Sequence, residues 1–210
     1  MRSLLLLVAA GAIAIPARAQ TPRVARAFER AATPWIGLRN FGGRAFSPLN
    51  GNASYNPSLA VGAMFDRPLG RRTGVVLDVH VAPLARQELS DDESSARFSR
   101  VFAYGATAAL AGRFRPQAPI FFFGGATILG ATKRAIPGED GGAFSPGATL
   151  GAGLDLARSA RVGARIVYQA YFVKPPDTDA IGYRAESRAT DWTLGIGARI
   201  ALGRAGEATR

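Results

Sequence analysis

The chain has 210 residues, of which 48% are apolar and 20% charged, and its 26 basic residues exceed its 15 acids to give a net charge of +11. It contains no cysteine and a single histidine, His80, so disulfides, thiolate metal sites, cysteine nucleophiles and multi-histidine metal centres are excluded. Only Lys133 and Lys174 are lysines, which leaves 24 arginines (26 − 2). We do not take this charge as a sign of nucleic-acid binding, because a GC-rich genome also enriches arginine, alanine and glycine.

The first residues have the pattern of a secretory signal peptide. Met1-Arg2-Ser3 is a short basic start, 4–15 is an apolar run, and Pro16-Ala17-Arg18-Ala19 supplies an Ala-x-Ala cleavage site. The apolar run is too short for a transmembrane helix, and no later stretch reaches the roughly 18 apolar residues that such a helix needs. We therefore expect a signal peptide over 1–19, followed by a short N-terminal periplasmic segment over 20–34.

The rest of the chain alternates apolar residues with small or polar ones at a period of two, which is typical of β-strands. The pattern predicts eight strands, over 35–43, 58–66, 74–82, 98–112, 120–131, 147–156, 161–172 and 191–202. Three links are short (67–73, 113–119 and 157–160) and four are long (44–57, 83–97, 132–146 and 173–190). Regular alternation of short and long links is typical of an up-and-down barrel that has short turns at one end and long loops at the other.

The two faces of these strands indicate which side meets lipid. In 191–202, Leu194 and Ile196 share one face, whereas Thr193 and Arg199 share the other. The polar faces consist mainly of Gly, Ala and Thr, a composition that suits a narrow lumen better than a water-exposed surface. We therefore predict an all-β fold, an eight-stranded antiparallel up-and-down transmembrane β-barrel over 35–202, with a C-terminal tail over 203–210. The alternative is a soluble exported barrel, similar to a lipocalin, that binds an apolar ligand.

This pattern resembles the small eight-stranded outer-membrane β-barrels of the OmpA/OmpX type, over about 35–202. The resemblance implies the outer membrane of a Gram-negative bacterium as the location. We expect outer-membrane lipid and lipopolysaccharide as partners, no nucleic acid, and a monomer. One departure concerns the last predicted strand, which ends on Leu202, where the family usually has an aromatic residue that assists assembly.

The inward faces carry a small set of charged residues, which are the candidate functional residues: Arg39, Asp78, His80, Asp155, Arg165 and Arg199. A lone buried charge is costly, so we expect Arg–carboxylate pairs that plug the lumen. The alternative is a narrow passive channel that uses the same charges.

Catalysis by these residues is disfavoured. Asp78 and His80 share a strand face and, with a hydroxyl nearby, could form a hydrolytic arrangement. However, Val81 and Ala82 follow His80, so the His-x-Ser signature of lipid A-modifying barrels is missing. We predict a non-enzymatic protein with a structural or surface-interaction role and with no catalytic residue, metal site or cofactor.

Overall fold

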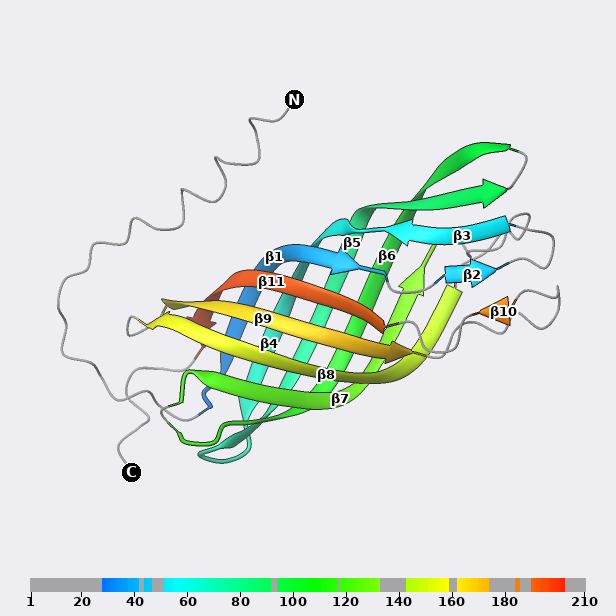
Figure 1. The fold of residues 1–210 in the computed structure, drawn as a ribbon. Helices are drawn as coiled ribbons and strands as arrows, with labels where there is room; N and C mark the ends of the chain where they lie inside the picture. The colour runs from blue at the N-terminus through cyan, green and yellow to red at the C-terminus, as the bar shows by residue number, and fades with distance from the viewer. Residues whose placement is uncertain are drawn as a thin grey trace.

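The described residues of the computed structural model are 28–41, 44–46, 51–91, 94–116, 118–132, 143–158, 162–173, 184–185 and 190–202. Within them, eight strands form a closed antiparallel barrel (Figure 1): β1 (Ala31–Asn40), β4 (Ser58–Pro68), β5 (Thr73–Asp91), β6 (Ser94–Gly112), β7 (Ile120–Ala131), β8 (Ala143–Arg158), β9 (Val162–Val173) and β11 (Thr190–Ala201). Each strand pairs with the next of this series, and pairing of β11 with β1 closes the barrel. The predicted fold is therefore confirmed.

The strand bounds differ from the predicted ones mainly at β1, at the β5–β6 hairpin and at β8, which begins at Ala143 rather than at 147. β1 begins at Ala31, so 31–34 belong to the barrel rather than to the N-terminal segment. β5 and β6 run through most of the predicted link 83–97, because they continue as a hydrogen-bonded hairpin as far as Asp91 and Ser94. The expected signal peptide over 1–19 and the tail over 203–210 lie outside the described residues. No helix among the described residues is long and apolar enough to span a bilayer.

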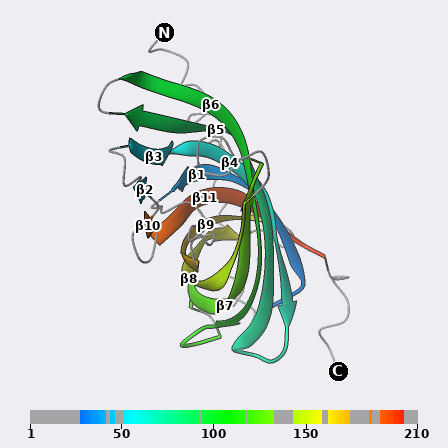
Figure 2. The same cartoon turned by 90° about the vertical axis from the view of Figure 1, so that its right-hand side faces the viewer.

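Three short strands add a sheet extension to one end of the barrel: β2 (Arg44–Phe46), β3 (Gly51–Asn56) and β10 (Arg184–Ala185). β5 pairs with β4 up to Val81, has a bulge between Ala82 and Ala85, and then pairs with β3 from Arg86 onward. β2 pairs with β3, and β10 pairs with β2. Figure 2 shows these strands and the upper parts of β5 and β6 standing beyond the barrel wall. We call this end the loop side and the opposite end, which holds the short links, the turn side.

The side chains of the barrel strands alternate between the lumen and the outer surface as predicted. On β9, Arg165 and Gln169 are buried, whereas Tyr168 and Phe172 between and beyond them are exposed. Most large apolar side chains on the outer face are exposed in the same way, including Leu38, Leu77, Leu110, Leu150 and Ile196. A closed sheet satisfies its own backbone hydrogen bonds, so an apolar outer face of this kind is suited to contact with lipid.

Glycines on the lumen face make room for aromatic rings. A Cβ built on Gly153 would lie 2.1 Å from Cζ of Phe121, and one built on Gly151 would lie 2.1 Å from Cζ of Phe123. Both rings are buried, and they stack with centroids 6.0 Å apart. The glycines of β8 therefore make room in the narrow interior for the large side chains of the neighbouring strand β7.

Candidate functional site

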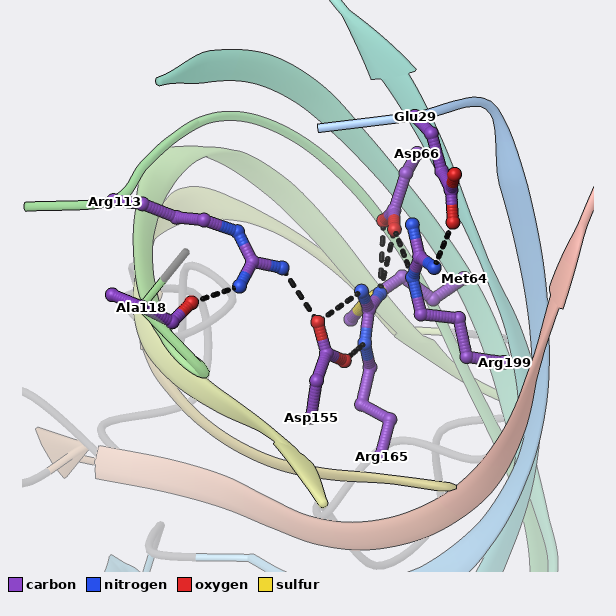
Figure 3. A network of polar contacts seen from close by, with 8 residues as sticks. All are labelled: Glu29, Met64, Asp66, Arg113, Ala118, Asp155, Arg165 and Arg199. Carbon is purple, nitrogen blue, oxygen red and sulfur yellow. Dashed lines mark hydrogen bonds and ion pairs between the residues drawn. The ribbon is translucent and has the colours of Figure 1, made fainter. Parts of the chain in front are cut away.

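The turn-side half of the lumen holds a chain of alternating charges, which we call the turn-side cluster (Figure 3): Glu29, Arg199, Asp66, Arg165, Asp155 and Arg113. Its centre is Arg165 on β9, whose side chain is fully buried. Nη1 of Arg165 lies 2.8 Å from Oδ2 of Asp66 on β4, and its Nε lies 2.8 Å from Oδ1 of Asp155 on β8. One guanidinium thus joins strands that lie on different parts of the barrel wall.

The chain continues in both directions from Arg165. Arg199 on β11 bonds Asp66 through Nε at 3.4 Å and Glu29 through Nη1 at 2.6 Å. Arg113, directly after β6, donates through Nη2 to Oδ2 of Asp155 at 2.5 Å and through Nη1 to the carbonyl oxygen of Ala118. The cluster contains as many arginines as carboxylates, so its formal charges cancel within the low-dielectric interior.

Two aromatic rings pack against this cluster. The Cζ atom of Arg165 lies 4.6 Å from the ring centroid of Phe121, and the Cζ atom of Arg113 lies 5.0 Å from that of Phe28. Phe28 and Phe121 also contact each other edge to face, with centroids 6.1 Å apart. Guanidinium groups over aromatic faces are favourable, so the two rings stabilise the buried arginines of the cluster.

The loop-side half of the lumen holds a second group, the loop-side cluster: Trp35, Arg39, Asp78, His80 and Asp191. Asp78 accepts a hydrogen bond from Nε1 of Trp35 at 2.8 Å and lies 2.9 Å from Nδ1 of His80. Nε2 of His80 lies 3.5 Å from Nη1 of Arg39. This geometry favours the tautomer in which Nδ1 carries the proton toward Asp78 and Nε2 accepts from Arg39. Arg39 also pairs with Asp191, Nη2 to Oδ2 at 3.3 Å.

Hydroxyl and amide groups lie between the two clusters. Nε2 of Gln169 donates to Oγ1 of Thr107 at 2.8 Å, and Thr107 lies 3.0 Å from Oγ1 of Thr127 across neighbouring strands. Closer to the loop side, the hydroxyl of Tyr171 lies 3.1 Å from that of Thr193. Among the buried side-chain polar atoms that the structure describes, only Oγ1 of Thr33 and Nε of Arg39 and Arg113 lack a partner.

The structure brings the candidate residues into two groups rather than one. Asp155, Arg165 and Arg199 belong to the turn-side cluster, and Arg39, Asp78 and His80 belong to the loop-side cluster. Arg165 contacts Asp155, but Asp78 bonds Trp35 and His80 rather than an arginine. Within the described chain, an arrangement of Asp78 and His80 with a hydroxyl is not formed, since Arg39 occupies the Nε2 side of the ring.

Four charged members of the clusters were not identified from the sequence: Glu29, Asp66, Arg113 and Asp191. Asp66 has the same strand parity as Met64, and Asp191 has that of Thr193, so alternation alone could have placed both of them in the lumen. Arg113 was assigned to a short link, and Glu29 to the N-terminal segment, where no periodicity exists. In the described part of the chain no group of three metal-ligating side chains occurs.

Comparison with protein-family models and with curated proteins finds no match. Among solved structures, the chain is similar to the outer membrane protein OprG from Pseudomonas aeruginosa, with a TM-score of 0.58, 9% identity, and coverage of 84% of this chain and 98% of that one. It is also similar to the outer membrane protein AlkL, with a TM-score of 0.50, 14% identity and coverage of 89% and 96%. The chain has the fold of a small outer-membrane barrel.

This fold agrees with the predicted location, because the solved structures that share it are outer-membrane proteins. It does not support the soluble lipocalin-like alternative, since the apolar faces point outward and the charged faces point into the lumen. In outer-membrane barrels the short turns lie on the periplasmic side and the long loops outside the cell. We therefore expect the turn side to face the periplasm and the loop side to face the outside of the cell.

Proposed function

We propose that the protein is a non-enzymatic outer-membrane barrel with a structural or surface-interaction role, and that Arg–carboxylate pairs plug its lumen. The observation that carries the proposal is the turn-side cluster, in which Arg165 bridges Asp66 and Asp155 across the interior. Separating a buried ion pair leaves uncompensated charges and is therefore costly. Passage of an ion through the cluster would require several such pairs to separate at once.

The remaining lumen supports the same function. The loop-side cluster, and the hydroxyl and amide groups between the two clusters, place further hydrogen-bonded side chains in the interior. His80 is held between Asp78 and Arg39, a position that serves packing and charge compensation rather than proton transfer to a substrate. The sheet extension of β2, β3, β10 and the upper β5 and β6 supplies a large hydrogen-bonded surface on the loop side for interactions outside the membrane.

The test is the electrical conductance of the folded protein in a planar bilayer. We expect no steady current from the parent, because a hydrated ion could pass the turn-side cluster only if its buried ion pairs separated. A folded porin inserted under the same conditions is the positive control for detection. A stable open current from the parent, in a preparation whose gel migration shows it to be folded, would overturn the plug and favour the narrow passive channel.

A further inference from the structure

Three polar side chains form a row across neighbouring strands, at the level where the sheet extension leaves the barrel. Asn56 on β3 is directly opposite Arg86 on β5, and Arg86 is directly opposite Arg100 on β6. Residues that are directly opposite in an antiparallel sheet point to the same face, with Cβ atoms about 4.5–5.5 Å apart. Two guanidinium groups therefore stand side by side, with a carboxamide next to them.

The row faces outward, and none of the acidic side chains that the structure describes compensates its charges. Arg86 and Arg100 are exposed, whereas the adjacent Ala85 and Val101 are buried. Neither arginine makes an ion pair with any residue whose side chain the structure describes. Like charges directly opposite each other destabilise a sheet. An anion bound between the two arginines would remove that repulsion.

The position of the row relative to the apolar surface indicates which anion is available. Leu84 and Phe102, each two residues closer to the barrel on the same outward face, are large apolar side chains with exposed fractions of 64% and 41%. The two arginines thus lie two residues further along their strands than these apolar side chains, at the depth where lipid headgroups begin. On the loop side of an outer-membrane barrel, that is the extracellular leaflet.

We propose that Arg86 and Arg100, with Asn56 beside them, bind a phosphate group of a phosphorylated glycolipid in the outer leaflet. A guanidinium offers two parallel N–H donors that match the geometry of phosphate oxygens, and an asparagine amide adds a further donor. Leu84 and Phe102 would contact the start of the acyl chains below. The inference goes beyond the plugged lumen and rests on the proposed outer-membrane location.

The experiment measures how much lipopolysaccharide stays bound to protein extracted from outer membranes in mild detergent, by native mass spectrometry. We expect the double variant Arg86→Gln/Arg100→Gln to lose about tenfold in bound glycolipid, the effect of one or more charge-assisted hydrogen bonds. The matched control is Arg71→Gln/Arg72→Gln, which removes the same charge from exposed positions on the turn side. The control should retain the parent's bound glycolipid, because that rim faces the other leaflet.

Two results would overturn the site. One is unchanged retention by the Arg86/Arg100 variant, and the other is an equal loss in both double variants, which would indicate a general effect of charge. Folding of each variant is checked by heat-modifiable gel migration.

A second measurement needs no variant. Purified parent in detergent should bind diphosphorylated lipid A and bind dephosphorylated lipid A about tenfold less, since only the phosphate engages the arginines. Equal binding of both would contradict the site. Because this assay uses the protein in detergent, its result is independent of where the protein is found in the cell, so a failure of the outer-membrane location is distinguished from a failure of the site.

Discussion

Asp66 is the most deeply buried carboxylate of the turn-side cluster. Its carboxylate is fully buried, and it lies between Arg165 and Arg199, so it compensates two guanidinium groups at once. Arg165 retains Asp155 if Asp66 is neutralised, but Arg199 retains only Glu29, at the edge of the cluster. Loss of this one charge leaves three arginines facing two carboxylates among buried side chains.

We therefore predict that Asp66→Asn lowers the free energy of unfolding by about 3–5 kcal/mol, the cost of breaking a buried pair by removing one partner. The measurement is urea unfolding in lipid vesicles. Asp155→Asn is the comparison variant. It should lower the free energy of unfolding by less, because the Asp155 side chain is 17% exposed and water can screen the arginine charges that are left unpaired.

A compensating variant checks the cause of this destabilisation. Asp66→Asn/Arg199→Gln restores the balance of charges and leaves Glu29, which is partly exposed, to be hydrated. It should be more stable than Asp66→Asn alone. If Asp66→Asn is as stable as the parent, the turn-side lumen is filled with water and the ion pairs there do not seal it.

At the level of the strand, β11 shows how closely the lumen face is packed. Gly195 is buried on the inward face, and a Cβ built on it would lie 2.7 Å from Cε3 of Trp35 on the neighbouring strand β1. Trp35 is fixed by its hydrogen bond to Asp78, so its ring has little freedom to move aside. The alternation alone, which assigns Gly195 to a narrow lumen, gives no indication of this contact.

We predict that Gly195→Ala destabilises the barrel by about 1–3 kcal/mol, the usual cost of overpacking an interior. The matched control is Gly124→Ala on the outer face of β7, where the new methyl would lie 3.0 Å from the end of the exposed Leu150 side chain and 3.6 Å from the carbonyl oxygen of Thr149. Thermal unfolding in detergent compares the two. Equal stability of both variants would mean that the ring of Trp35 does not pack against Gly195.

The sequence predicts the barrel strands well because strand alternation is a local property. Leu194 and Arg199 fall on the correct faces of β11 without knowledge of any other strand. The pairs inside the lumen are different, since the meeting of Asp66 with Arg165 depends on register and closure around the barrel. The alternation predicts a link over 83–97, where β5 and β6 continue as a hairpin, because this part of the sequence has no regular apolar alternation.

For the whole molecule, the barrel and the sheet extension have separate sets of hydrogen bonds. Barrel closure around β5 uses Thr73–Ala82 paired with Gly112–Ala103 of β6, and β4 pairs with the same half of β5. The extension uses the part of β5 from Arg86 to Asp91, paired with β3 and with the upper β6. The lumen clusters lie in the barrel and do not require the extension.

We predict that the hairpin tip can be removed without loss of the barrel. Replacing 87–99 by Asn-Gly joins Arg86 to its partner Arg100 through a two-residue loop, the length and composition that favour a tight hairpin turn. The shortened protein should sediment with outer membranes, like the parent, and should show the heat-modifiable gel migration of a closed barrel that resists cold detergent. Loss of that migration in the shortened protein alone would mean that the extension is part of the folding unit. Recovery of the parent itself in the soluble periplasmic fraction without detergent would instead contradict the membrane barrel, because the exposed apolar faces of β4, β5, β9 and β11 would then have to be covered by something other than lipid.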